Sequence, residues 1–433
     1  PANRYVGGGS MEFSGTVDFC IYYAGNDGQL YCFPTSAEYA FRVPLEATAE
    51  FDLNDGLFCY AISEAESIVS RVSGPRKMNI KCRLRARVRA YGRCVLEEKR
   101  QGDACDEERL LQEAITSDSA YGISEPLVVS EEILLEQEDG KVSEVRIISG
   151  DAQVMVSEAS CAGGQVHCRG EVVLKLLLQR ENTEGQASEP PMVVVRKLPL
   201  NGEIAMDGAT INGEAVATGC CTALNLSLED GRVLCDAEIV LEARTQCRQS
   251  ISYTADWYAA GRRSDCVTTR YALPVAGRVF NGNFTQSDAR SLDELGIAKD
   301  AKIIDVAGNA IVEGVEAEKA RYIVTGKCRY SLILLSDGEM SAKELELPFR
   351  YMLDGDASEQ AIHPFLYEAQ VHSVIARART DGERLAIDGE LAVAGRTWYM
   401  QEVQMVSGVT VGEEIPAAAG QLRLCYPTGD DTL

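Results

Sequence analysis

The residues of this 433-residue chain that could do chemistry are few and scattered. Its histidines are His167, His363 and His372, and no two of them have the i and i+4 spacing of a metal-binding helix. A triad hydrolase or a metalloprotease needs histidine in a defined relation to a nucleophile, a carboxylate or a second ligand. The sequence therefore predicts no catalytic residues, no cofactor-binding residues and no metal site, and it favours a protein that is not an enzyme.

The 15 cysteines do not form a metal-binding pattern, because no CxxC pair occurs. Many of them lie in apolar strand patterns, where a free cysteine serves as a small buried side chain. The alternative is oxidative cross-linking of an assembly, and Cys20 and Cys32, across a predicted hairpin, are the first candidate disulfide. In a reducing cytosol such bonds would form late or not at all.

One group of charged residues is unusual. Lys81, Arg83, Arg85, Arg87 and Arg89 occupy every second position of a predicted strand, with apolar residues or cysteine between them. Period-2 alternation places all five cations on one face of the sheet. One interpretation is a solvated face whose cations pair with acids on neighbouring strands. The other is an interaction surface that docks on an acidic face of another module or another subunit.

Acidic partners for this row exist in the same chain. Two later strands that occupy equivalent places in the repeat described below carry acids, namely Asp236, Glu238 and Glu242 in one and Asp388 and Glu390 in the other.

The formal net charge of the whole chain is −24, which disfavours nucleic acid or an anionic membrane as partner. No apolar run is long enough to cross a bilayer, and the first residues do not resemble a signal peptide. We therefore expect no nucleic-acid binding and no membrane insertion.

The elements that position these residues come from a triplication. A glycine followed by an alternating apolar strand begins at Gly15, Gly170 and Gly326, with steps of 155 and 156 residues. Steps of this size indicate one domain-sized unit copied along the chain. Asp-Gly turns between alternating runs are strong hairpin signals, and they occur at 26–28, 139–140, 230–231, 337–338 and 381–382. The sequence predicts an all-β fold of three tandem antiparallel β-sandwich-like modules, with short connecting helices near 106–114 and after Ser291.

The predicted boundaries follow from the same landmarks. The first module spans 1–100 and is N-terminally incomplete, because only 14 residues precede Gly15. The remaining parts are a connector at 101–142, a second module at 143–262, a connector at 263–300, a third module at 301–412 and a tail at 413–433.

The order of motifs resembles a known family. The Gly15 strand, Phe41-Arg-Val-Pro-Leu45 and Gly74-Pro-Arg-Lys-Met-Asn-Ile80 are similar to the SPOCS domain of sporulation proteins in clostridia-like anaerobes. The resemblance covers nearly all of the chain, best in the first module and least in the second. The tail, which ends Gly429-Asp-Asp-Thr-Leu433, looks like the lead-in to a LysM module but carries an extra aspartate.

The resemblance implies a non-enzymatic structural or adaptor protein of the bacterial spore envelope, in coat or exosporium morphogenesis. It implies synthesis in the mother-cell cytosol and a final place in the spore surface layers. Its partners would be other spore-envelope proteins or copies of itself, and peptidoglycan only through a LysM module that is absent from these residues. The alternative is a carbohydrate-binding envelope protein, for which Trp257, Trp398 and the tyrosines would offer stacking platforms.

Overall fold

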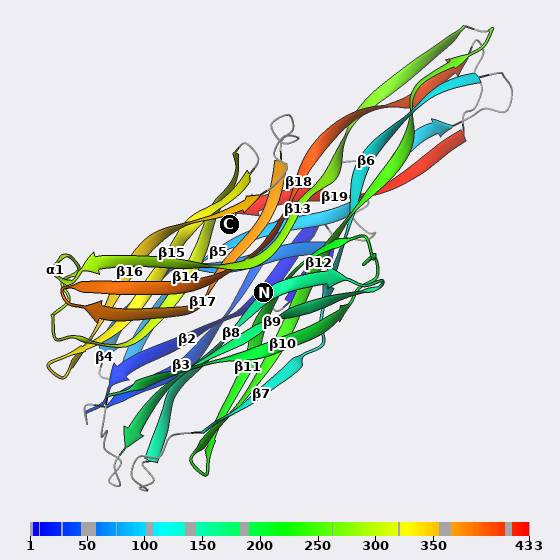
Figure 1. The fold of residues 1–433 in the computed structure, drawn as a ribbon. Coiled ribbons are helices and arrows are strands. Elements are labelled where there is room, and N and C mark those ends of the chain that lie inside the picture. Colours follow the sequence, from blue (N-terminus) through cyan, green and yellow to red (C-terminus); the bar gives the residue numbers. More distant parts are fainter. Residues whose placement is uncertain are drawn as a thin grey trace.

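The computed structural model describes residues 3–7, 9–26, 29–44, 58–74, 76–100, 107–134, 144–181, 190–261, 263–318, 321–354, 365–411 and 418–432. These residues are almost entirely β, in several antiparallel sheets, which confirms the all-β prediction (Figure 1).

The elements, in chain order, are β1 (Asn3–Gly7), β2 (Ser10–Ala24), β3 (Leu30–Pro44), β4 (Phe58–Gly74), β5 (Lys77–Arg100), β6 (Glu107–Ile123), β7 (Leu127–Leu134), β8 (Glu144–Cys161), β9 (Gln165–Glu181), β10 (Met192–Ala205), β11 (Glu214–Glu229), β12 (Arg232–Ala259), β13 (Ser264–Ser291), α1 (Leu292–Leu295), β14 (Lys302–Glu318), β15 (Arg321–Ser336), β16 (Glu339–Asp354), β17 (Phe365–Asp381), β18 (Arg384–Val411) and β19 (Ala418–Thr432).

One pattern of strand pairing occurs three times. A three-stranded meander, β1-β2-β3, β8-β9-β10 or β14-β15-β16, is followed by a long hairpin, β4-β5, β11-β12 or β17-β18. The second strand of each hairpin also pairs with a further strand, which we call the closing strand. Unit 1 is β1 to β5 closed by β19, unit 2 is β6 to β12 closed by β6 and β7, and unit 3 is β13 to β18 closed by β13.

The segments predicted as connectors are therefore parts of the sheets. The first connector contains β6 and β7, the second contains β13, and the tail contains β19, which pairs with β5 of unit 1. The helix predicted near 106–114 is wrong, because residues 107–114 begin β6. Their helical composition is overridden by an antiparallel ladder with the far half of β12, which has one register shift between Thr254 and Asp256. After Ser291 the chain does form one helical turn, α1, but the Ser291 side chain makes no capping hydrogen bond.

The long strands extend beyond the meanders as an arm, at the upper right of Figure 1. Ribbons β6-β12 and β13-β18 pack together there around an apolar core that includes Ile251, Tyr253, Leu273 and Met405. The β5-β19 ribbon contacts both of them. The arm thus combines one ribbon from each unit.

The repeated glycine has a packing role. In the register Gly15 faces Tyr39 and Gly326 faces Phe349, so each glycine lies beneath a ring from the next strand. A Cβ on Gly326 would lie 2.5 Å from the Phe349 ring and 2.2 Å from a backbone carbonyl oxygen. The landmark therefore marks a close approach of the next strand, and at Gly326 only glycine fits.

The predicted turns are formed where the structure describes them. Asp230-Gly231 and Asp337-Gly338 have positive φ at both residues, as a tight hairpin requires. The predicted turns at 26–28 and 139–140 lie wholly or partly outside the described residues.

Candidate functional site

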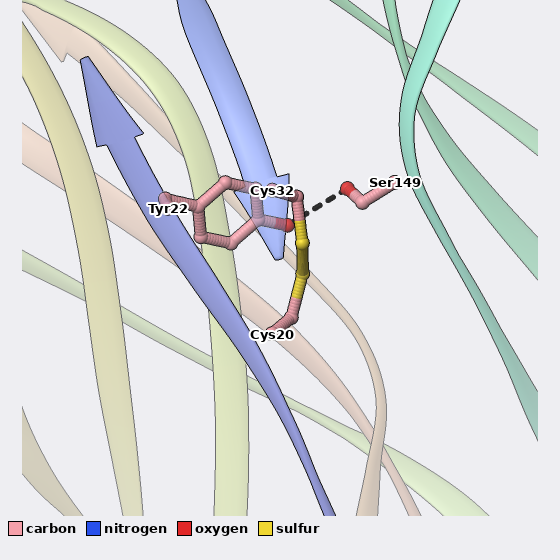
Figure 2. The surroundings of a disulfide bond; sticks show 4 residues. All are labelled: Cys20, Tyr22, Cys32 and Ser149. Atoms are coloured by element: carbon pink, nitrogen blue, oxygen red, sulfur yellow. Dashed lines mark hydrogen bonds between the residues drawn. A yellow bond between two sulfur atoms is a disulfide. The ribbon is translucent and has the colours of Figure 1, made fainter. Parts of the chain in front are cut away.

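The predicted disulfide is present between β2 and β3. Cys20 and Cys32 are bonded, with their Cα atoms 6.0 Å apart. Figure 2 shows that Tyr22, on the same strand as Cys20, reaches Ser149 of unit 2, with the two hydroxyl oxygens 2.8 Å apart. Burial raises the pKa of Tyr22 to about 12. The disulfide thus braces a hairpin that contacts the neighbouring unit.

The other cysteines whose side chains the structure describes are free thiols. Cys59, Cys168, Cys235 and Cys328 are buried, as expected for small apolar side chains. Cys220 is exposed.

The histidines that the structure describes are separated. His167 on β9 lies 3.2 Å from Glu203, whereas His372 on β17 hydrogen-bonds through Nε2 to the Val154 carbonyl at 2.8 Å. Burial lowers the pKa of His372, which keeps the ring neutral. His363 lies outside the described residues. Within the described part of the chain, no group of three or more histidine, cysteine or acidic side chains is arranged to hold a metal ion.

A cleft of about 630 Å³ lies where the three units meet. Its lining includes Tyr39, Asp151, Cys220 and His372. Cys220 keeps exposed surface, but partial desolvation by the cleft walls raises the pKa of its thiol. The described hydrogen bond of His372 is to a backbone carbonyl. Neither side chain is arranged as an activated nucleophile or its base.

The basic row on β5 divides into two halves. Lys81 and Arg83 are exposed, and Arg83 is only 3.9 Å from Glu66 in a solvent-exposed pair. Arg87 pairs with Glu64 of β4 at 2.7 Å, with both side chains mostly buried. Arg89 is 4% exposed. One half of the row therefore faces solvent, while the other half lies inside the molecule.

The acids predicted to face the row bind other groups in the described structure. Glu242 pairs with Arg4 of unit 1 at 2.7 Å, and Glu390 pairs with Lys197 of unit 2 at 3.0 Å. Both of these ion pairs join different units. The other three acids bind within their own units: Asp388 pairs with Arg379, Asp236 accepts from Ser130 and Glu238 accepts from Thr222.

Arg89 belongs to a set of three equivalent arginines. In the hairpin registers Arg89 faces Tyr60, Arg244 faces Val216 and Arg396 faces Glu368. The three arginines are 4%, 1% and 0% exposed, so all of them are buried. We call these three arginines, with Glu368, Tyr60, Tyr91 and Trp398 around them, the arginine centre.

Glu368 of unit 3 is the acceptor at this centre. Its carboxylate accepts a hydrogen bond from Arg396 Nε at 2.9 Å and one from the Tyr91 hydroxyl of unit 1. Arg244 Nε of unit 2 lies 3.6 Å from the same carboxylate. Burial alone would raise the pKa of Glu368, but the surrounding guanidinium groups outweigh it and lower the pKa. The carboxylate is therefore ionised and holds side chains from three units.

Aromatic rings complete the centre. The Arg244 guanidinium lies 4.1 Å from the Tyr60 ring centroid, and that of Arg396 lies 4.6 Å from the Trp398 ring centroid. The Arg89 guanidinium lies 5.5 Å from the Trp398 ring centroid and donates a hydrogen bond to the Tyr367 carbonyl at 2.8 Å. Desolvated cation–π contacts of this kind stabilise by about 2 kcal/mol each. The contacts indicate a structural junction and no catalytic arrangement.

The exposed half of the row lies on the β4-β5 hairpin tip, which we define as residues 67–74 and 76–83. On one face Ile68, Val72 and Met78 are 54%, 67% and 40% exposed. The register places Val72 opposite Met78 and Ile68 opposite Cys82, so these residues share that face. Lys81, opposite Val69, lies on the other face. The hairpin tip therefore presents exposed apolar side chains together with cations.

Both tryptophans are buried, at 6% exposure for Trp257 and 2% for Trp398. Trp257 also donates from Nε1 to Glu107 at 2.9 Å. Neither ring offers the open stacking face that the carbohydrate alternative requires.

Sequence reasoning did not find Glu368, Arg244 or Arg396. A signal was available, because Arg244-Thr245 and Arg396-Thr397 repeat at equivalent positions of the long strands and Arg89 occupies the same place in β5. Glu368 has no counterpart in the other units, so the repeat alone could not identify it.

Comparisons with protein-family models, with curated proteins and with solved structures found no match. The only helix in the described part of the chain is the single turn α1, and no described helix is long and apolar enough to cross a membrane.

Proposed function

We propose that this protein is a non-enzymatic structural or adaptor component of the bacterial spore envelope, active in coat or exosporium assembly through protein–protein contacts and self-assembly. The SPOCS-like order of motifs supports the spore setting, with synthesis in the mother-cell cytosol and later incorporation into the surface layers. Partners would be other envelope proteins or further copies of this chain.

The observation that carries the assembly function is the hairpin tip. Its apolar face exposes Ile68, Val72 and Met78, and its other face carries cations that include Lys81 and Arg83. Exposed apolar side chains rimmed by charge are typical of interaction sites. Because the whole chain has a net charge of −24, a basic tip complements the acidic surface of a second copy.

Charge reversal tests this function. In Lys81→Glu/Arg83→Glu we expect assembly, measured by sedimentation velocity at increasing concentration, to weaken at least tenfold. Neither residue contacts the arginine centre, so the variant should fold. High salt should weaken assembly of the unaltered protein, because exposed charges are screened.

The matched control is Arg350→Glu, which reverses an exposed cation of unit 3 that pairs with Glu318 at 3.2 Å. It should assemble as the unaltered protein does. Equal assembly by the charge-reversed tip and the control would contradict the proposed role of the tip.

A further inference from the structure

The closing strands of the three units differ in how they are connected. In unit 3, β13 leads through α1 directly into β14 of the same unit. In unit 2, β6 and β7 likewise precede β8 of the same unit. Unit 1 is closed by β19, which starts at Ala418, while β5 ends at Arg100. The strand that closes unit 1 is therefore covalently continuous with unit 3.

The β19 strand occupies the same structural place as the other closing strands. The closing strands begin at residues 107, 264 and 418, which keeps the step of the triplication. β19 pairs antiparallel with β5 from Ala418 opposite Arg100 to Thr432 opposite Arg87, with a bulge after Pro427. Within its sheet the order is β19-β5-β4, so β19 is an edge strand. A proline and a bulge are both compatible with an edge position.

We propose that β19 is exchanged between copies of this chain, so that β19 of one copy closes unit 1 of the next. This inference rests on the proposed function, because it supplies a mechanism for self-assembly. The exchanged pairing re-forms the contacts with β5 that exist within one copy, so the two states differ mainly in the entropy of association and the path of the chain.

The geometry of exchange is head-to-tail. The donated strand β19 is covalently continuous with unit 3 and the accepting strand β5 belongs to unit 1, so the two surfaces of each contact differ. A heterologous contact of this kind produces a ring when the rotation closes and a filament when it does not. Six sequence positions separate the end of β18 from the start of β19. A separation this short sets an effective concentration for closure within one copy of roughly millimolar order, so exchange competes with closure when the protein concentration approaches that range.

A disulfide trap in the full chain tests this inference. Leu424 lies directly opposite Cys94 in the register. Opposed residues of an antiparallel pair have Cα atoms about 4.5–5.5 Å apart, which a disulfide can span. The donor carries Leu424→Cys with Cys94→Ser and Cys425→Ser, so it cannot close on itself at this position. The acceptor keeps Cys94 and carries Cys425→Ser.

Mixing donor and acceptor at high concentration, followed by mild oxidation, should give a covalent heterodimer linked between residues 424 and 94, identified by peptide mass spectrometry. Its yield should rise at least tenfold from micromolar to near-millimolar protein. A control donor with Gln421→Cys, three residues away in the register, should give no such link. Absence of the 424–94 link at every concentration would overturn the proposal.

A second measurement separates strand exchange from assembly in general. The single variant Leu424→Cys, oxidised when dilute, locks β19 onto its own β5. If exchange drives assembly, the locked chain remains a monomer at concentrations where the reduced chain assembles. If locked and reduced chains assemble equally, strand exchange is refuted while the proposed function survives. The hairpin-tip variants then report on that function independently.

Discussion

Replacement of Glu368 by glutamine should be among the most destabilising conservative changes in this protein. Glu368 is 3% exposed and lies between Arg396, at 2.9 Å, and Arg244, at 3.6 Å. Removing one partner of a buried ion pair costs about 3–5 kcal/mol, because the remaining charge is left uncompensated. Here two arginines and the Tyr91 hydroxyl lose the same carboxylate, so we expect a loss of about 5 kcal/mol.

Urea unfolding followed by tryptophan fluorescence measures this loss. Trp398 is part of the arginine centre, and Trp257→Phe in the background makes Trp398 the sole tryptophan. With a denaturant slope of about 3 kcal/mol/M, a loss of about 5 kcal/mol lowers the midpoint by about 1.7 M. The control is Glu346→Gln, which removes a 2.6 Å pair with Arg329 where the glutamate side chain is 44% exposed. An exposed pair of this kind contributes about 0–1 kcal/mol.

The double variant Glu368→Gln/Arg244→Met separates lost charge compensation from lost packing. In Glu368→Gln both arginines lose their counter-charge. Replacing Arg244 by methionine in that background should recover part of the lost stability, because an apolar side chain needs no counter-charge. Two results would refute this account of the arginine centre. The first is that Glu368→Gln unfolds at the same urea concentration as Glu346→Gln. The second is that Glu368→Gln/Arg244→Met is less stable than Glu368→Gln by the full free energy expected for loss of another buried ion pair, about 3–5 kcal/mol.

Two further predictions concern pH and the repeated glycine. The pKa of Glu368 is lowered in the folded state, so its ionised carboxylate contributes fully to stability at neutral pH. This contribution is lost as the pH falls below the unfolded value of about 4.3 and then through the lower folded value. Unfolding midpoints measured between pH 7 and 3 should therefore fall less steeply in Glu368→Gln than in the unaltered protein. Gly326→Ala should lower the free energy of unfolding by about 1–3 kcal/mol in thermal or urea unfolding, because the added methyl group meets a carbonyl oxygen at 2.2 Å. The control Gly74→Ala should be close to neutral, because no atom lies within 4 Å of the added methyl group.

Local patterns in the sequence predicted the strands well. Alternation and Asp-Gly turns identified the hairpins, because side-chain period and turn chemistry depend on neighbouring residues alone. The Cys20–Cys32 bridge also followed from a local hairpin. The same local reasoning failed at β6, where good helix formers are held extended by pairing with β12, a partner more than 100 residues away.

The arginine centre shows a second limit. Period-2 alternation correctly placed Arg87 and Arg89 on one face, but it could not show that this face is buried against other units. Their partners, Glu64 for Arg87 and the Tyr367 carbonyl for Arg89, are brought in by the hairpin register and by the packing of unit 3. The acids predicted from the equivalent strands of the repeat include Glu242, which pairs instead with Arg4 of another strand.

The arginine centre and the closing strand share one stretch of β5. β19 pairs with β5 from Arg87 to Arg100, and this range contains Arg89 and Tyr91, which contact unit 3 at the centre. Separation of β19 from β5 breaks the backbone hydrogen bonds along this stretch, and their free energy is lost. An isolated copy with β19 detached bears this cost in full. A copy that receives β19 from its neighbour does not, because the same register is formed again. The lost pairing thus disfavours the open monomer relative to both closed states, and the choice between closure and exchange is left to protein concentration.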